Sequence, residues 1–149
     1  MNLPTLDDVK NYLLGRKYRS TLDLQAAYQA LPIAEDSQHL LGFEYRGDIW
    51  CFTKSPFGIN FLVARFQATL RACLGHTDSI SYLDDILSAH DDLGTHMDNL
   101  VQIVDALTEN GFRINLTKSQ FLKQTIVYWG YQWGHNAVKP PDERIRQLV

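Results

Sequence analysis

Two adjacent aspartates, Asp84 and Asp85, stand between two short apolar segments, and this feature restricts the fold more than any other in the chain. Residues 80–89 alternate about a tight centre at Leu83 and Asp84, which predicts two short strands joined by a turn. Adjacent carboxylates repel each other, and partial burial between strands raises that cost. The pattern predicts either an ordinary turn, where aspartate is common for local hydrogen-bonding reasons, or a site at which a cation offsets the repulsion.

A third aspartate ends a separate predicted strand. Residues 16–24 are expected to form that strand, in which Asp23 lies between two leucines. If this strand neighbours the hairpin, Asp23 and Asp84 converge on one site, and Asp85 completes or orients it. Magnesium prefers oxygen ligands and takes one or two carboxylates together with substrate phosphates. The three aspartates are therefore the candidate ligands of two Mg²⁺ (or Mn²⁺) ions, which lie about 4 Å apart in sites of this kind.

The rest of the chain alternates short strand patterns with amphipathic helices. We expect helices over residues 4–15, 62–75 and 92–111, and a last helix that begins at Asp142. A hairpin is expected over 40–53, and short strands over 112–116, 126–129 and 131–133. This order predicts an α+β fold, an antiparallel sheet with helices packed on one face, of the split βαβ or ferredoxin-like kind.

The helix expected over 92–111 has the clearest period. Asp91 or Asp92 can cap it and Gly111 ends it. Its apolar positions, expected to be buried, are Leu93, Met97, Leu100, Val104 and Leu107.

Composition limits the class of protein. The chain has 149 residues with 45% hydrophobic residues, which suits one domain. No apolar run approaches the roughly 20 residues of a membrane span, and the N-terminus does not resemble a signal peptide. Two cysteines without metal or disulfide spacing favour an intracellular protein rather than a secreted one. The net charge of −3 is unfavourable for a protein that holds nucleic acid by itself.

Several motifs in chain order resemble the reverse transcriptases of gypsy-type LTR retrotransposons and of retroviruses, including foamy viruses. The first is Thr21-Leu22-Asp23-Leu24 with Ala27-Tyr28 after it, and the second is the loop Ser55-Pro56-Phe57-Gly58. Phe66-Gln67, the Tyr82-Leu83-Asp84-Asp85 turn and Tyr128-Trp129-Gly130-Tyr131 follow in the order typical of the family. The run from Asn60 to Arg65 departs from the family pattern of Asn, a small residue and Pro at that place.

The resemblance implies a role for each motif. The catalytic residues would be Asp23, Asp84 and Asp85, with the Leu24 main chain as a further metal ligand. The nucleotide-binding residues would be Gln25, Ala26, Ala27, Tyr28, Phe57 and Gly58, with Tyr28 as the gate against a ribose 2′-hydroxyl. Primer and template would contact Gln67, Tyr82, Leu83, Trp129, Gly130 and Tyr131.

The resemblance also implies a fragment of a larger polyprotein. Residues 1–139 would be the palm, with 1–15 as the helix at the junction with the fingers, and 140–149 would lead to a thumb. The partners would be an RNA or DNA template with primer, a dNTP, and the fingers, thumb and ribonuclease H of the same polyprotein. The positive charge that this chain lacks would lie on those parts, and the fragment alone would be inactive.

Other residues permit two interpretations. Arg16, Lys17 and Arg19 are either phosphate contacts or the solvated edge of a strand. The five histidines show no metal-ligand spacing and are expected to be structural or on the surface.

Three functions remain open from the sequence. The leading hypothesis is an RNA-directed DNA polymerase (nucleotidyltransferase) palm that uses two metal ions. The second is a host-domesticated or isolated palm that acts as a binding module without catalysis, and the third is a related palm polymerase with another template preference.

Overall fold

The computed structural model describes residues 4–25, 31–56, 60–134 and 137–140 of the chain. Its helical elements are α1 (Leu6–Leu13), the 3₁₀ segment η2 (Glu35–Leu41), α2 (Asn60–Leu74) and α3 (Leu93–Glu109). Its strands are β1 (Tyr18–Gln25), β2 (Gly42–Tyr45), β3 (Asp48–Cys51), β4 (Ile80–Tyr82), β5 (Asp85–His90), β6 (Arg113–Ile114), β7 (Gln120–Lys123), β8 (Ile126–Tyr128), β9 (Tyr131–Trp133) and β10 (Val138–Lys139). The predicted helix from Asp142 lies outside the described residues.

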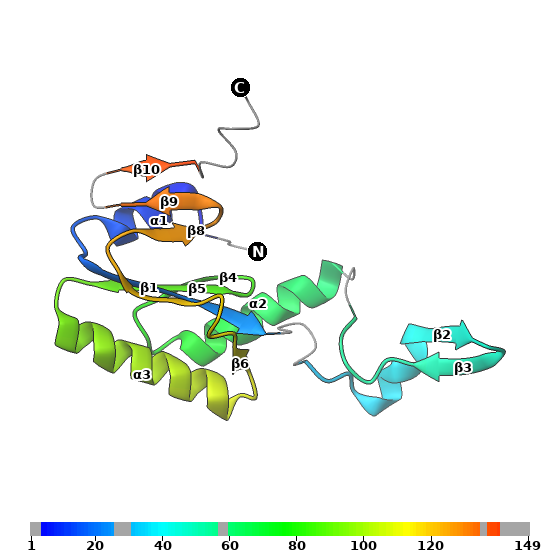
Figure 1. The fold of residues 1–149 in the computed structure, drawn as a ribbon. Helices are drawn as coiled ribbons and strands as arrows, with labels where there is room; N and C mark the ends of the chain where they lie inside the picture. The colour runs from blue at the N-terminus through cyan, green and yellow to red at the C-terminus, as the bar shows by residue number, and fades with distance from the viewer. Residues whose placement is uncertain (1–3, 26–30, 57–59, 135–136, 141–149) are drawn as a thin grey trace, which may run out of the picture.

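An antiparallel sheet forms the centre of the molecule. Its strands run in the order β4-β5-β1-β6, and β7 also pairs with β1. α2 and α3 cover one face, while α1 and the smaller sheet β10-β9-β8 lie over the other (Figure 1). The β2–β3 hairpin and η2 extend away from these layers (Figure 1). The predicted α+β class is confirmed.

Two apolar clusters fill the spaces on either side of the central sheet. Leu22 of β1 and Ile86 of β5 belong to the cluster beneath α2 and α3, together with Phe66 and Leu107. The intervening residues of the same strands point the other way, as the strand period of two requires. Thus Leu87 of β5 packs in the second cluster, against α1 and the β8–β9 hairpin. β5 is therefore apolar on both faces.

The helix termini follow local rules that the sequence displays. Thr5 caps α1 in a capping box, in which its hydroxyl oxygen accepts from the Asp8 amide and the Asp8 carboxylate accepts from the Thr5 amide. Asp92, one of the two expected caps, accepts a hydrogen bond from the Thr95 amide at 2.8 Å. Gly111 has φ +78°, the left-handed conformation that suits glycine after a helix.

The buried face of α3 differs from the expected one. Leu100 and Leu107 are buried as predicted, but Leu93, Met97 and Val104 are 45, 43 and 37% exposed. The helix is turned so that its core-facing positions are Ile103, Ala106 and the polar pair His96 and Asn99. The prediction was wrong because it assumed that the apolar positions would all face inward.

Arg19 is neither a phosphate contact nor part of a solvated strand edge, and both interpretations were wrong. Its side chain is 1% exposed. The guanidinium donates to the main-chain oxygens of Gln124 at 2.6 Å, Trp133 at 3.4 Å and Leu13 at 3.5 Å. These partners come from three separate segments, so Arg19 ties β1 to α1 and to the second sheet.

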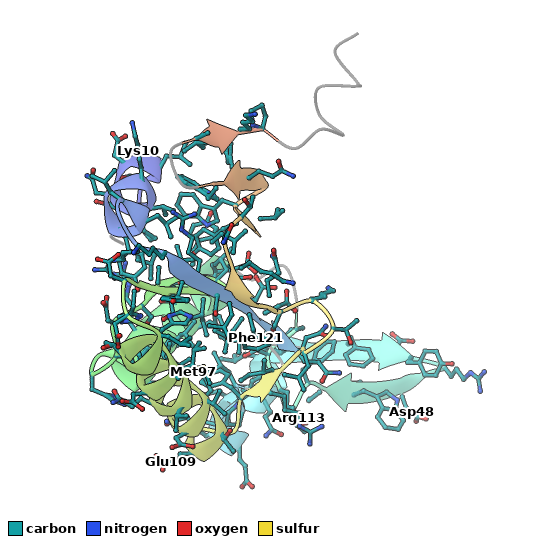
Figure 2. The ribbon with its side chains drawn as sticks, turned by 60° about the vertical axis from the view of Figure 1, so that its left-hand side comes forward. Lys10, Asp48, Met97, Glu109, Arg113 and Phe121 are labelled. Carbon is teal, nitrogen blue, oxygen red and sulfur yellow. The ribbon has the colours of Figure 1, made fainter. Side chains whose placement is uncertain are left out.

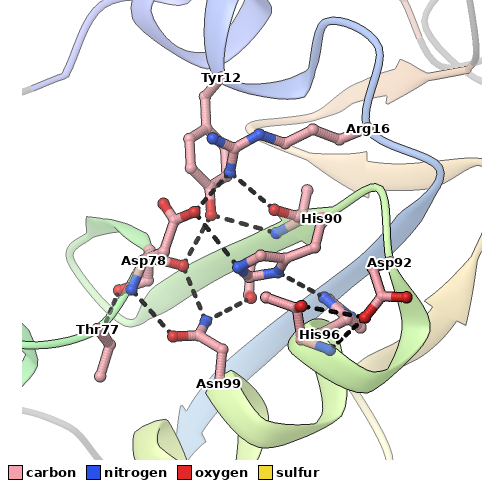
Figure 3. A network of polar contacts seen from close by, with 12 residues as sticks. Tyr12, Arg16, Thr77, Asp78, His90, Asp92, His96 and Asn99 are labelled. Atoms are coloured by element: carbon pink, nitrogen blue, oxygen red, sulfur yellow. Dashed lines mark hydrogen bonds and ion pairs between the residues drawn. The ribbon is translucent and has the colours of Figure 1, made fainter.

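Arg16 is held within the protein as well. Its Nη1 lies 2.8 Å from Asp78 Oδ2 and donates to the Ala89 oxygen at 2.7 Å, as Figure 3 shows. Its guanidinium also lies 4.2 Å from the centre of the Tyr12 ring. Of the three predicted phosphate contacts, only Lys17 remains as an exposed side chain without a contact that the structure defines.

Two histidines belong to the same polar network and have a structural role, as predicted. His96 is fully buried, and its Nε2 lies 2.8 Å from the Ser20 hydroxyl. His90 Nδ1 and His96 Nδ1 are 3.0 Å apart, and Asn99 donates to Ser88 at 2.9 Å (Figure 3). Burial, and then the neighbouring His90, lower the pKa of His96 to about 4, so its ring is neutral at physiological pH.

In the part of the chain that the structure describes, no helix has the length and apolar character needed to cross a membrane.

Candidate active site

The Asp84–Asp85 motif forms the expected hairpin. β4 and β5 pair with Tyr82 opposite Asp85, so Leu83 and Asp84 form a two-residue turn. Leu83 has φ +53°, a conformation that a leucine adopts at a cost of roughly 1–2 kcal/mol. Such strain persists only where surrounding contacts enforce it.

Gln67 supplies those contacts. This α2 residue is 1% exposed. Its Nε2 donates to the Ser81 oxygen at 2.9 Å, and its Oε1 accepts from the Leu83 amide at 2.7 Å. The expected contact of Gln67 with primer or template does not fit this burial, because both ends of its amide are bonded inside the chain. Its place in the structure is to hold the strained turn.

Asp23 lies beside this turn because β1 and β5 are neighbours. In the antiparallel register Asp23 is opposite Asp85, and residues directly opposite each other point to the same face of a sheet. The Leu24 amide donates to the Asp84 oxygen at 2.9 Å. All three predicted catalytic aspartates are thus brought together at one end of the central sheet.

The segment after β6 fixes the main chain of Asp23 from the other side. The Asn115 amide donates to the Asp23 oxygen at 2.8 Å. The Asp23 amide donates to the Ser119 hydroxyl at 3.1 Å, and that hydroxyl donates to the Asn115 oxygen at 2.7 Å. The sequence analysis assigned no role to Asn115 or Ser119, because only the fold places them against Asp23.

The pKa values of Asp23 and Asp85 are raised at this site. Burial, followed by the charges of Asp84 and Asp23, raises the pKa of Asp85 to about 6. The pKa of Asp23 is also raised, by burial and by Asp84. The positive charge of Lys118 opposes both shifts. Sequence reasoning missed this role of Lys118, which is the cation that acts on both carboxylates.

The chemistry of these side chains suits divalent cations. In the described segments, no three His, Cys, Asp or Glu side chains form a ready-made metal cage. A complete cage is not expected for Mg²⁺, which takes one or two carboxylates and fills its octahedron with water and substrate phosphates. Three mutually repelling carboxylates, two of them with raised pKa, form a set of donors that bound cations would stabilise.

A cleft adjoins the hairpin. It has a volume of about 590 Å³ and is lined by the turn and by the β8–β9 hairpin, namely Leu6, Tyr82, Leu83, Asp84, Asp85, Trp129, Gly130 and Tyr131. Trp129 and Gly130 form a second two-residue turn, with φ +55° and +68°. Six residues were assigned to primer and template. The structure places all of them except Gln67 in the lining of one cleft, together with Asp84 and Asp85.

Aromatic contacts connect the two hairpins. The Tyr82 and Trp129 rings meet edge to face with centroids 4.4 Å apart, and the Trp129 ring stacks on Tyr128 at 5.9 Å. The Trp129 Nε1 and the Tyr128 hydroxyl are buried and have no hydrogen-bond partner among the residues that the structure describes. Burial raises the pKa of Tyr128, so its hydroxyl keeps its proton. The positions of the two turns are consequently coupled through three rings.

The nucleotide-binding positions are only partly visible. Gln25 is exposed at the end of β1, opposite Arg113 of β6. Ala26, Ala27, Tyr28, Phe57 and Gly58 lie outside the described residues.

The sequence of this chain is similar to those of known reverse transcriptases. The family profile for "Reverse transcriptase (RNA-dependent DNA polymerase)" matches residues 2–133. The Pro-Pol polyprotein of simian foamy virus type 1 is 32% identical over 116 residues, which cover 77% of this chain and 10% of that protein. The Pol polyprotein of the Drosophila melanogaster transposon opus is 27% identical over 98% of this chain and 15% of its own length.

Solved structures agree with the sequence relatives. The foamy viral protease-reverse transcriptase in complex with an RNA/DNA hybrid matches all of this chain and 21% of its own, with 27% identity and a TM-score of 0.87. A second structure of that foamy viral protein, with double-stranded DNA, gives a TM-score of 0.89. The chain spans only a small part of these relatives. The match over residues 2–133 nevertheless shows that the chain belongs to the reverse transcriptase family, related to the Pol polyproteins of foamy viruses and gypsy-type transposons.

Proposed function

We propose that this chain is the palm of an RNA-directed DNA polymerase, which transfers a nucleotide from a dNTP to a primer 3′-hydroxyl with the help of two divalent cations. The observation that supports it most is the register of β1 and β5. It sets Asp23 opposite Asp85 and next to the Asp84 turn, and Asp84 and Asp85 themselves line an open cleft. A turn without function would not need three carboxylates close together, two of them with a raised pKa.

Asp23 and Asp84, with the Leu24 main chain, would hold the cations, and Asp85 would complete or orient the site. When bound, Mg²⁺ or Mn²⁺ would activate the primer hydroxyl and neutralise the leaving pyrophosphate. The protein's own contribution is to keep the carboxylates in place. Gln67 on the turn and Ser119 on the main chain of Asp23 do so by hydrogen bonds at 2.7 and 3.1 Å. These two residues position the catalytic groups and do not touch substrate.

The primer would lie along the cleft beside the Trp129–Gly130 turn, with Tyr82 and Tyr131 on its walls. Support comes from the lining of the cleft, which joins this turn to the catalytic turn. The stacked Tyr128 ring and the edge-to-face Tyr82 ring fix the Trp129 side chain, so the turn can present its main chain to a sugar-phosphate backbone without rearrangement.

The nucleotide would bind at the end of β1, where Gln25 is exposed. Ala26, Ala27 and the proposed gate Tyr28 follow Gln25 directly, and Phe57 with Gly58 would abut the base or sugar. These assignments rest on the motif order in the sequence.

The whole enzyme would need more protein than this chain. We assign residues 1–139 to the palm, with 1–15 at its junction with the fingers, and 140–149 to the approach to a thumb. The relatives, of which this chain covers 10 to 15%, are consistent with fingers, thumb and ribonuclease H supplied by the same polyprotein inside the cell or a virus-like particle.

A chimera tests the proposal. Residues 2–133 replace the matching segment of the simian foamy virus type 1 protein, and extension of a DNA primer on an RNA template is followed with Mg²⁺. We expect extension by the chimera, its loss in Asp84→Asn by at least about a thousandfold, and its retention in Asp105→Asn, a control at an exposed α3 position. A folded chimera that binds primer–template but does not extend it would instead support the non-enzymatic binding module.

A further inference from the structure

We propose that the outward face of α3 is a docking surface for a basic amphipathic helix of a partner protein. This surface, here named the outer stripe, consists of Leu93, Met97, Val101 and Val104. The inference goes beyond the polymerase function, because the outer stripe lies on the far side of the central sheet from the carboxylate-bearing face.

The outer stripe is apolar, continuous and exposed. Its residues follow at intervals of four, four and three positions, so they share one side of the helix. They are 45, 43, 55 and 37% exposed in chain order. α2 and α3 form the outer layer on that side of the sheet (Figure 1), and Figure 2 shows Met97 and Glu109 along α3. Single exposed apolar residues are normal, but an aligned row of four marks a contact surface.

α3 does not need the outer stripe in order to fold. A different face, with Leu100, Ile103 and Leu107, is buried against the central sheet. The helix is capped at its start by Asp92. Exposed positions of such a helix would ordinarily be polar. Burial of the apolar side chains therefore requires something outside the described part of this chain.

The charge beside the outer stripe identifies the chemistry of the partner. Asp98, Asp105 and Glu109 follow one another along the adjacent solvent-facing side, at intervals of seven and four residues. α3 carries neither lysine nor arginine from Leu93 to Glu109. A partner with an apolar row and lysine or arginine next to it would match both rows of α3 at once.

Other occupants fit less well. A second copy of α3 would bring one acidic row against another, which disfavours a symmetric pair. Nucleic acid is polyanionic and offers no apolar row. A helix laid along α3 at the usual packing distance covers an apolar row of this length with two or three of its own turns.

Two designed peptides test the surface on the intact chain. Both are helical with leucine at heptad a and d positions, and the remaining positions are mainly lysine in one and glutamate in the other. Binding is measured by fluorescence anisotropy, and the contact is located from amide chemical shifts. We expect the lysine peptide to bind at α3, more weakly as salt rises, and the glutamate peptide to bind at least about tenfold more weakly.

Variants of the chain separate the apolar contribution to peptide binding from the electrostatic one. Met97→Gln with Val101→Gln should weaken binding of the lysine peptide by at least about tenfold. Glutamine is a good helix former, so both substitutions should leave α3 folded. Leu40→Gln with Ile49→Gln, at positions of η2 and β3 that are 74 and 83% exposed, is the matched control and should leave the affinity for the lysine peptide unchanged. Asp98→Lys with Asp105→Lys should reverse the preference toward the glutamate peptide.

Three results would overturn the proposal. The first is equal binding of both peptides, and the second is a shift map that does not include α3. The third is self-association of the chain that Met97→Gln with Val101→Gln abolishes, since the occupant would then be a second copy.

Discussion

Replacing Asp85 by asparagine should make the metal-free protein more stable at neutral pH. The Asp85 carboxylate is partly buried and lies near the negative charges of Asp84 and Asp23, which together raise its pKa from 3.8 to about 6. At neutral pH the Asp85 carboxylate is ionised, and its charge is less favourable in the folded state than in the unfolded state. The ionised group therefore lowers the free energy of unfolding. Asparagine has nearly the same shape and no charge, so it removes the opposition while leaving the hairpin intact.

The magnitude follows from the pKa. A rise from 3.8 to about 6 corresponds to at most about 3 kcal/mol of lost stability once the group is fully ionised. Asp85 is only partly buried and Lys118 opposes the shift, so solvent screening reduces this ceiling. We expect Asp85→Asn to raise the free energy of unfolding by roughly 1–2 kcal/mol at pH 7.5.

The sign of the pH dependence is fixed. A carboxyl group with a raised folded-state pKa favours folding while it is protonated, and that contribution is lost as pH rises through the folded value. The wild type therefore loses this contribution between about pH 4 and pH 6, whereas the asparagine variant does not. The difference between the two proteins should be full above pH 6 and vanish below pH 4.

Urea unfolding in the presence of a chelator measures the difference, at pH 7.5 and again at pH 4. Asp105→Asn, at an exposed position of α3, is the control and should differ little from the wild type at either pH. Equal stability of wild type and Asp85→Asn at pH 7.5 would refute the reasoning, because the carboxylate would then carry no electrostatic penalty.

Three further outcomes are expected from urea unfolding. Gln67→Leu should cost about 2–3 kcal/mol, because it leaves the Ser81 oxygen and the Leu83 amide without partners. Leu83→Gly should stabilise the chain by about 1 kcal/mol, because glycine adopts the positive φ without strain. His96→Gln should flatten the loss of stability on going from pH 6.5 down to about 4. A buried base with a lowered pKa destabilises the fold as the unfolded state takes up protons, here by up to about 3 kcal/mol.

Local signals were sufficient for most elements and for the catalytic geometry. Gly111 at the end of α3 and Gly47 in the turn of the hairpin expected over 40–53 are glycines with positive φ, as their places in the sequence indicate. The Asp84 turn follows from the alternation of residues 80–89. The sequence placed Asp23 and Asp84 at one site because each lies at the end of a predicted strand. The pairing of β1 with β5 brings the two residues together.

Tertiary partners explain what the sequence could not predict. Periodicity cannot distinguish an apolar row that faces the core from one that faces outward, and α3 has both. The burial of Arg19 depends on main-chain oxygens contributed by residues 13, 124 and 133, which no local pattern connects. The burial of Gln67 depends on its hydrogen bonds to the Leu83–Asp84 turn and to Ser81, which a local pattern does not indicate. β7 and β10 lack the alternation that identifies a strand, and they exist through their pairing with β1 and β9.

The most direct test of the central claim is a metal-rescue experiment on Asp84 in the foamy virus chimera. Asp84→Cys replaces an oxygen ligand by a thiolate, which binds Mg²⁺ poorly and binds softer ions such as Mn²⁺ or Cd²⁺ better. If Asp84 holds a catalytic cation, single-turnover primer extension should be lost in Mg²⁺ and partly regained when Mn²⁺ or Cd²⁺ is added, with no such gain in Asp84→Asn. Extension by Asp84→Cys at the wild-type rate in Mg²⁺, or no recovery with either softer ion, would contradict the two-metal site.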